Sequence, residues 1–138
     1  MKKERRIFLQ QAGIIAATTA FIPNVLWSAT RPKKEKLRVA LVGLGYYSTD
    51  LLAPALQLTK NCELKGIVTG SPEKIPVWKK KYELEDKNIY DYGNFDSIAN
   101  NPDIDVVYVV LPPSMHAEYT IRAAKAGKHD WCEKPMAP

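Results

Sequence analysis

Five short runs rich in apolar and β-branched residues recur along the chain from residue 37 onward. They read LRVALVG (37–43), CELKGIVTG (62–70), NIYDY (88–92), DVVYVVL (105–111) and KHDWCEKP (128–135), the last with its exit loop. Runs of this length and composition, bounded by turn residues, are typical of strands buried in a parallel sheet. We therefore predict five strands, of which the third is short.

The segments between these runs have the apolar spacing and the end signals of helices. Pro54 is expected in the first turn of the first helix, and Ser71 and Pro72 are suited to begin the second as N-cap and first helical residue. Pro76 should shorten or distort the start of that helix, and Gly127 should end the last one. The predicted helical segments are residues 48–60, 71–82, 94–101 (a short turn) and 114–127.

Strands that alternate with helices imply right-handed crossovers and a doubly wound parallel sheet with helices on both faces, the α/β architecture of Rossmann dinucleotide-binding domains. Ligands of such sheets bind at the carboxyl ends of the strands, where the strand order reverses. The loops that follow Val42, Val68, Tyr90, Val110 and Cys132 are therefore the candidate binding loops.

The first of these loops, GLGYYS (43–48), lies between a predicted strand and a predicted helix. Gly43 permits a tight turn, Gly45 lets the backbone approach a pyrophosphate, and Ser48 is small enough for the helix to pack on the strand. The beginning of the helix offers backbone N–H groups and a positive dipole end to phosphates. A turn that serves packing alone is the alternative.

The second loop indicates which dinucleotide is bound. An acid at the end of the second strand would grip the ribose 2′-hydroxyl of NAD, but this strand ends in Thr69, Gly70 and Ser71. Lys74, in the next turn, is placed to pair with a 2′-phosphate, while Glu73 can serve the helix dipole. We therefore predict NADP rather than NAD, with a solvated Lys74 as the alternative.

The net charge of +5 belongs to the N-terminal segment. Residues 1–34 contain seven Lys or Arg and one Glu, so residues 35–138 contain thirteen bases and fourteen acids. A nearly neutral body argues against a nucleic-acid partner.

The N-terminal segment has the pattern of an export signal. Arg5 and Arg6 precede an apolar stretch that is short for a membrane span, which needs roughly 20 apolar residues. We predict a twin-arginine signal over residues 1–29, a linker over 30–36, and periplasmic export through the twin-arginine machinery. An amphipathic helix, or an uncleaved segment that tethers the chain to the membrane, is the alternative.

Cysteine and histidine usage predicts neither a disulfide nor a metal site. In a sheet of order 3-2-1-4-5, Cys62 and Cys132 would lie roughly 14 Å apart, at ~4.8 Å per strand. A disulfide needs Cα atoms within about 7 Å. The two histidines, His116 and His129, show no metal-ligand spacing with them.

The segment from NIYDYGNFDSIANN through LPPSMHAE to AGKHDWCEKPMAP resembles the Gfo/Idh/MocA family of oxidoreductases. The resemblance covers residues 37–138, and within the family it is strongest to the glucose–fructose oxidoreductase group. It implies hydride transfer between a sugar and a tightly held NADP, a periplasmic location and a homo-oligomer. A dehydrogenase of the same family that acts on a cyclitol or another sugar is the runner-up.

The resemblance also assigns site residues. It places Lys134 of the Glu-Lys-Pro motif as the active-site lysine, which would hydrogen-bond the sugar hydroxyl and favour its deprotonation. His116 is assigned to the wall after the fourth strand, with packing or capping as an equally weighted alternative. The implied cofactor-binding residues are Gly43, Leu44, Gly45, Tyr46, Tyr47, Thr69, Gly70, Lys74, Tyr92, Leu111, Pro112, Pro113, His116, Glu133, Lys134 and Pro135.

Three positions depart from the family pattern. Tyr46 is bulky for its loop, Pro113 replaces an expected Asn and so removes an amide, and Asp130 interrupts the fifth strand. The family also carries a second domain, with further acid/base residues, after the Glu-Lys-Pro loop. We therefore expect residues 37–138 to be the front part of a larger enzyme, with a non-catalytic dinucleotide-binding module as the rival interpretation.

Overall fold

A computed structural model describes residues 36–136 of the chain. Five parallel strands form one sheet in the order β3-β2-β1-β4-β5, as predicted. The strands are β1 (Leu37–Val42), β2 (Cys62–Val68), β3 (Ile89–Tyr90), β4 (Val106–Val109) and β5 (His129–Cys132). The strand order reverses between β1 and β4, so a crevice at their carboxyl ends is the expected ligand site.

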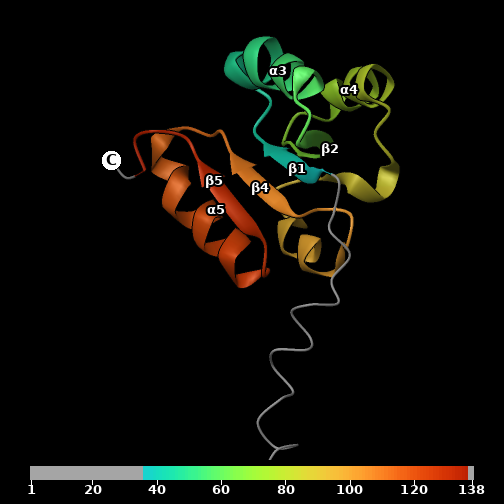
Figure 1. Ribbon diagram of the computed structural model, residues 1–138. Helices are drawn as coiled ribbons and strands as arrows, with labels where there is room; N and C mark the ends of the chain where they lie inside the picture. Colours follow the sequence, from blue (N-terminus) through green and yellow to red (C-terminus); the bar gives the residue numbers. More distant parts are fainter. Residues whose placement is uncertain (1–35, 137–138) are drawn as a thin grey trace, which may run out of the picture. The chain divides into compact units, whose positions relative to one another are not determined.

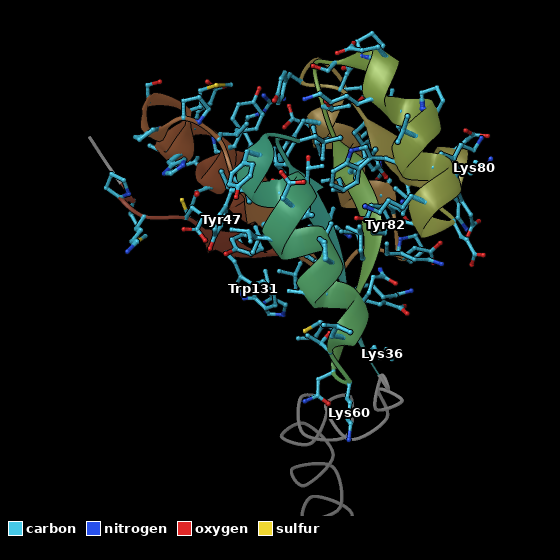
Figure 2. The ribbon with its side chains drawn as sticks, turned by 90° about the horizontal axis from the view of Figure 1, so that it is seen from above. Lys36, Tyr47, Lys60, Lys80, Tyr82 and Trp131 are labelled. Atoms are coloured by element: carbon cyan, nitrogen blue, oxygen red, sulfur yellow. The ribbon has the colours of Figure 1, made fainter. Side chains whose placement is uncertain are left out.

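Helices cover both faces of this sheet (Figure 1), which confirms the doubly wound fold class. On one face lie the π-helical turn η1 (Tyr47–Leu52), α3 (Ala53–Leu58) and α4 (Ile75–Tyr82), and on the other the 3₁₀ turn η4 (Phe95–Asn100) and α5 (Pro113–Lys125). Shorter 3₁₀ turns are η2 (Pro72–Lys74) and η3 (Asp86–Asn88). In Figure 2 the η1–α3 helix crosses the sheet with Tyr47 near its beginning and Lys60 beyond its end.

The two faces of β1 bury alternate residues in separate cores. Val39 and Leu41 pack with Trp78 beneath α3 and α4, whereas Ala40 and Val42 pack with Phe95 toward η4 and α5. Each fully buried side chain of this size contributes roughly 1.5–3 kcal/mol. The near-continuous apolar run of β1 is therefore explained by burial on both sides.

The first helix differs from the continuous α-helix predicted over residues 48–60. Its first part is π-helical, with the Ala53 N–H bonded to the Ser48 carbonyl five residues back. Pro54 lies in the first turn of α3. Because proline has no N–H for the usual bond and its ring crowds the carbonyl four residues back, the wider turn accommodates Pro54 inside the helix.

The other helix ends agree with the predictions except in detail. The hydroxyl of Ser71 makes no capping hydrogen bond, although η2 begins directly after it. Helix α5 begins at Pro113 rather than Ser114, and Gly127 follows it with a φ of 70°. Proline is tolerated at a first helical position because that N–H would have no helical partner, so the exchange at Pro113 costs no helical bond.

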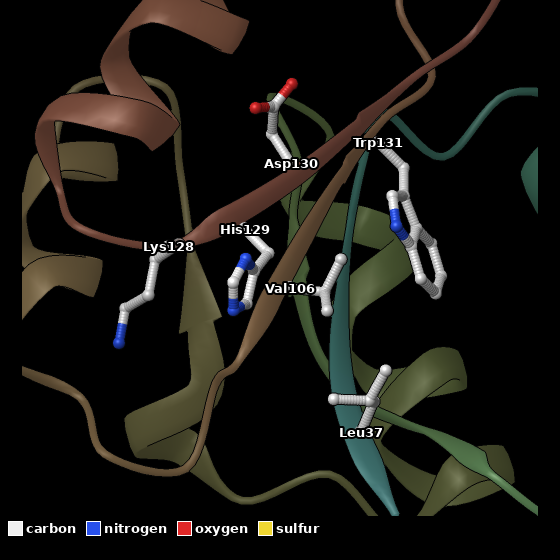
Figure 3. Close-up of a pocket in the computed structure, with 6 residues that line it drawn as sticks. All are labelled: Leu37, Val106, Lys128, His129, Asp130 and Trp131. Carbon is white, nitrogen blue, oxygen red and sulfur yellow. The ribbon is translucent and has the colours of Figure 1, made fainter. Parts of the chain in front are cut away.

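Asp130 and the cysteines lie where their strands place them. Asp130 and Trp131 point to opposite sides of β5 (Figure 3), and Asp130 is half-buried rather than enclosed. The expected penalty for a buried carboxylate therefore does not arise. Cys62 on β2 and Cys132 on β5 are free thiols separated by β1 and β4, as predicted.

A charged network lies near the amino ends of β1 and β4. Arg38 Nη1 lies 3.2 Å from Asp103 Oδ1, Arg38 Nε lies 3.0 Å from Asp105 Oδ2, and Lys87 Nζ lies 2.7 Å from Asp103 Oδ2. The hydrogen bond from Lys87 holds the pKa of Asp103 below its ordinary value. These ion pairs are at the end of the sheet opposite to the candidate binding loops.

Candidate functional site

The glycine loop after β1 is shaped by close contact with the neighbouring strands. Gly43 has a φ of 91°, and its N–H donates to the Val68 carbonyl of β2 at 2.9 Å. A Cβ at this position would lie 2.4 Å from the Val110 carbonyl oxygen after β4. Only glycine fits here without strain, because the conformation is left-handed and the space is already filled by backbone.

Ser48 secures this turn from the helix side. Its side chain is fully buried, and its hydroxyl donates to the Gly43 carbonyl at 2.5 Å. The predicted small residue therefore does more than allow packing, because it fixes the orientation of the Gly43 peptide.

Gly45 is different from Gly43. A Cβ at Gly45 would meet no atom within 4 Å, so its backbone faces open space. The absence of a side chain here leaves room for a ligand rather than for the protein itself. Gly43 thus has the tight-turn role that the sequence predicted, while the approach of a pyrophosphate to Gly45 stays a prediction.

The loop after β2 lies beside the glycine loop and contains no acid at the strand end. The Thr69 N–H donates to the Tyr90 carbonyl at 3.0 Å, and the Thr69 hydroxyl oxygen accepts from the Ser71 N–H at 3.0 Å. A Cβ on Gly70 would lie 2.8 Å from the Tyr92 ring, so that ring closes the outer side of the loop. Burial raises the pKa of Tyr92, which keeps its hydroxyl protonated.

Lys74 connects the two loops. Its Nζ donates to the Leu44 carbonyl at 2.8 Å, which places a cation next to the glycine turn. The side chain is half-buried and lies between two hollows, both of which it lines.

The first hollow is a cavity of about 380 Å³ at the carboxyl ends of β1, β2 and β4. Nine of the predicted cofactor-binding residues line it, and no carboxylate is among its described lining residues. Ser71 and Val110 also line it. Ser71 was predicted only as a possible hydrogen-bond donor to a 2′-phosphate, and Val110 only as the residue before a candidate binding loop. The lining residues are Gly43, Leu44, Gly45, Thr69, Gly70, Ser71, Lys74, Tyr92, Val110, Leu111 and Pro112.

This hollow fits a dinucleotide pyrophosphate. Two negatively charged phosphates need backbone N–H groups and no competing carboxylate, and the glycine loop with the lining described above supplies this set. We call it the dinucleotide hollow.

Other predicted residues lie outside this hollow. Tyr46 is largely exposed and lines the second hollow, also about 380 Å³, between η1 and α4. Tyr47 is also exposed, at the start of η1. Pro113 is exposed at the first position of α5.

The Glu-Lys-Pro loop after β5 is held near the end of β4. The Glu133 N–H donates to the Val109 carbonyl at 3.0 Å, and the Tyr108 hydroxyl donates to a Glu133 carboxylate oxygen in a short hydrogen bond. Burial, and then the bond to Glu133, raise the pKa of Tyr108 well above its ordinary value. Lys134 is exposed, and the peptide bond between Lys134 and Pro135 is cis.

His116 is a buried link rather than an open wall of the site. It is 1% exposed, and its ring nitrogens lie 2.6 Å from the Pro135 and Leu111 carbonyl oxygens. The alternative role of packing or capping, left open by the sequence, describes this environment better than contact with a ligand.

A different hollow of about 500 Å³ lies at the opposite end of the sheet (Figure 3). It is lined by Leu37, Val106, Lys128, His129, Asp130 and Trp131, none of which is a predicted site residue. Because parallel sheets bind ligands at the carboxyl ends of their strands, the smaller dinucleotide hollow is the better candidate.

Within residues 36–136, no helix has the length and apolar character needed to cross a membrane. Nor does this part contain a cluster of three or more His, Cys, Asp or Glu side chains that could hold a metal ion. The predicted export signal lies outside the described residues.

Comparison with known proteins identifies relatives for this region. A family profile described as "Oxidoreductase family, NAD-binding Rossmann fold" (Gfo/Idh/MocA) matches residues 37–138. The crystal structure of aldose-aldose oxidoreductase from Caulobacter crescentus, complexed with glycerol, superposes with a TM-score of 0.72 at 45% identity. The match covers 74% of this chain and 30% of that chain.

Curated relatives give a consistent result. The D-xylose 1-dehydrogenase [NADP(+)] of Haloarcula marismortui is 30% identical over 110 residues, which are 80% of this chain and 30% of the relative. The scyllo-inositol 2-dehydrogenase (NADP(+)) of Bacillus subtilis is 28% identical over 77% of this chain and 28% of the relative. The chain thus spans about three tenths of the length of these relatives, and it belongs to the Gfo/Idh/MocA family of oxidoreductases, whose nucleotide-binding Rossmann region it contains.

Proposed function

We propose that this chain is the nucleotide-binding part of an NADP-dependent sugar oxidoreductase similar to the glucose–fructose oxidoreductase group. The observation that carries the proposal is the dinucleotide hollow, with Lys74 at its side and no carboxylate among its described lining residues. The bound nicotinamide would supply the hydride acceptor or donor. The chain's own residues would hold the nucleotide and present Lys134 at the end of the sheet.

The preference for NADP follows from charge. A carboxylate at the end of β2 would repel a 2′-phosphate, whereas this loop offers a lysine ammonium and the hydroxyl of Ser71. Lys74 has a flexible stem, so its ammonium can exchange the Leu44 carbonyl for a phosphate oxygen without backbone movement. Two of the relatives named above carry NADP(+) in their names, which supports the same choice.

The test is a calorimetric titration of NADPH and NADH against the full chain and two variants. Lys74→Ala removes the cation at the hollow, and Lys80→Ala removes an exposed lysine further along α4 as a matched control. We expect the wild type to bind NADPH more tightly than NADH. In Lys74→Ala the affinity for NADPH should fall about ten- to hundredfold, which is the usual effect of losing a charged hydrogen bond. Lys80→Ala should bind as the wild type does.

Two outcomes would contradict the NADP assignment. Equal affinities of the wild type for both cofactors would remove the preference itself. An equal loss of both cofactors in Lys74→Ala would show that this lysine acts only by holding the glycine loop through Leu44.

The chemistry proposed for Lys134 is proton handling. Oxidation of a sugar alcohol removes a hydride from carbon and a proton from the attached hydroxyl. A lysine amine that accepts a hydrogen bond from that hydroxyl can take its proton, and the protonated amine can return one in the reverse direction. The exposed position of Lys134 leaves its side chain accessible to a substrate.

A cyclitol is the second candidate substrate, favoured by the similarity to scyllo-inositol 2-dehydrogenase. Sugars and cyclitols share adjacent secondary hydroxyls, so the proposed role of Lys134 is the same for both. Saturation-transfer NMR on the NADP-loaded chain with glucose, xylose and scyllo-inositol separates them. Contact with scyllo-inositol alone would favour the cyclitol assignment.

The location of the protein is also a proposal. A protein that binds its nucleotide in the cytoplasm needs an export route for folded chains, which a twin-arginine signal over residues 1–29 would supply. Replacing Arg5 and Arg6 by lysine should retain a reporter fused after Lys36 inside the cell. Continued arrival of the reporter in the periplasm would point to another route.

A further inference from the structure

The loop of residues 133–135, here called the Lys134 loop, leaves the edge strand of the sheet. Strand β5 pairs with β4 on one side only, and exit loops of edge strands have few backbone partners of their own. The side chain of Lys134 is exposed, and its one hydrogen bond within the described part of the chain runs from its backbone N–H to Glu133 Oε2, at 3.3 Å. The position of this lysine therefore depends on how its two neighbours are held.

Tyr108 of β4 holds the neighbour before the lysine. Its hydroxyl donates to Glu133 Oε1, and the Trp131 ring meets the Tyr108 ring edge-on, with centroids 5.7 Å apart. The carboxylate that accepts from Tyr108 also accepts the backbone N–H of Lys134 through its other oxygen. A side chain in the middle of the sheet is thus connected to the lysine backbone through a single carboxylate.

His116 of α5 holds the neighbour after the lysine. Its Nδ1 lies 2.6 Å from the Pro135 carbonyl oxygen and its Nε2 lies 2.6 Å from the Leu111 carbonyl oxygen. A carbonyl oxygen only accepts, so each contact is a hydrogen bond when the facing ring nitrogen carries the proton. Leu111 lines the dinucleotide hollow, so His116 joins the wall of that hollow to the Lys134 loop.

We propose that Tyr108 and His116 are positioning residues that hold the Lys134 loop from both sides and fix it relative to the dinucleotide hollow. Neither side chain lines the hollow, and both act through backbone or carboxylate groups next to Lys134. The restraint of the loop by these two side chains does not depend on what Lys134 does, whereas its importance for catalysis rests on the function proposed above for Lys134.

The test compares the full chain with five variants, three at the proposed positioning residues and two as matched controls. Tyr108→Phe removes the hydroxyl that bonds Glu133, and Tyr82→Phe removes a buried hydroxyl that has no hydrogen-bond partner among residues 36–136. His116→Leu removes both ring contacts, His116→Gln keeps an N–H donor, and His129→Gln changes the other, exposed histidine. Urea unfolding establishes that each variant is folded.

Hydrogen–deuterium exchange of the amides of Glu133, Lys134 and Met136 measures the loop directly. We expect exchange about tenfold faster in Tyr108→Phe and His116→Leu, the effect of losing one hydrogen bond of typical strength. His116→Gln should lie between His116→Leu and the wild type, while Tyr82→Phe and His129→Gln should exchange as the wild type does. Wild-type exchange in both Tyr108→Phe and His116→Leu, with folding intact, would overturn the proposal.

A second readout separates positioning from simple stability. Acylation of the Lys134 amine is followed with and without NADPH, and the modified residue is located by peptide mass spectrometry. We expect NADPH to slow the acylation of Lys134 in the wild type and in Tyr82→Phe. In Tyr108→Phe, NADPH should still bind but should no longer slow the acylation. If His116→Gln and His116→Leu behave alike in exchange and in protection, packing rather than hydrogen bonding holds the loop, and the assignment of His116 is wrong.

The two proposals fail in different ways. If the wild type binds no NADPH, the proposed function is refuted and the exchange result still decides the loop. If NADPH binds and the exchange of the loop is unchanged in all variants, the positioning role is refuted and the nucleotide site remains.

Discussion

Exchanging Gly43 and Gly45 separately for alanine should damage two different properties of the same short loop. Gly43 has a φ of 91°, and a Cβ there would lie 2.4 Å from the Val110 carbonyl oxygen and 2.8 Å from Leu111 Cδ2. Gly45 has no atom within 4 Å of the corresponding position. We therefore predict that Gly43→Ala destabilises the fold and that Gly45→Ala weakens nucleotide binding.

The magnitude for Gly43→Ala follows from two costs. A left-handed conformation costs a non-glycine residue about 1–3 kcal/mol. Overlap with a backbone carbonyl in packed surroundings adds about 1–3 kcal/mol, and the reduced entropy of the unfolded chain returns about 0.4–1 kcal/mol. The net loss of roughly 1.5–5 kcal/mol is a large part of the about 5–15 kcal/mol that a domain of this kind possesses.

Urea unfolding followed by circular dichroism measures this loss. At a slope of about 1–2 kcal/mol per molar urea, the midpoint of Gly43→Ala should fall by roughly 1–3 M. Gly45→Ala should unfold at the wild-type midpoint or slightly above it. Its affinity for NADPH should fall about ten- to hundredfold, because the added methyl group keeps a phosphate from the backbone N–H groups.

Two results would contradict these expectations for the glycine loop. A wild-type midpoint for Gly43→Ala would mean that the turn relaxes at no cost and that its close contact with Val110 does not constrain it. Wild-type NADPH affinity in Gly45→Ala would mean that no phosphate approaches this glycine.

Two further predictions concern acid stability and turnover. Hydrogen bonds from Lys87 and Arg122 lower the pKa values of Asp103 and Asp96 from their ordinary 3.8. A lowered folded-state pKa contributes stability that is fully present above pH 3.8 and is lost as the pH falls through the folded-state pKa. The urea concentration at the unfolding midpoint should therefore decrease when the pH is lowered below about 4, and it should decrease less in Asp103→Asn. A midpoint that rises on acidification would contradict this. The 138-residue chain with NADP bound should not turn over aldoses, because exposed Lys134 alone cannot orient a sugar and exclude water. Orientation of the reactants can lower an activation barrier by about 7–11 kcal/mol. Nicotinamide reduction that disappears in Lys134→Ala would contradict this prediction.

The strands followed from the sequence because burial on both faces leaves a simple signature. LRVALV and DVVYVVL are apolar at nearly every position, and β1 and β4 each have a neighbouring strand on both sides. The π-helical turn at Tyr47–Leu52 was not predictable in this way. The spacing of apolar residues does not distinguish a helix with hydrogen bonds to the carbonyl four residues back from one with hydrogen bonds to the carbonyl five residues back. Pro54 indicates that the helix is irregular near this position, but not which kind of irregularity occurs.

The candidate site was predictable where local chain geometry decides it. Gly43, Gly45 and Lys74 belong to loops that follow adjacent strands, so strand order alone brings them together. The partners of His116 and Tyr108 were not predictable, because Pro135 and Glu133 are 19 and 25 residues away along the chain. A sequence pattern can mark such residues as notable, but the contacts that explain them arise only when β4, β5 and α5 pack together.

All the proposed chemistry depends on a nicotinamide dinucleotide that binds at the carboxyl ends of β1, β2 and β4. Backbone chemical shifts of the isotope-labelled chain, recorded as NADP⁺ is added, locate this binding site residue by residue. We predict the largest changes at Gly43–Gly45, Thr69–Ser71 and Leu111, which line the dinucleotide hollow. Changes confined to Leu37, Lys128 and His129, at the larger hollow at the opposite end of the sheet, would contradict it.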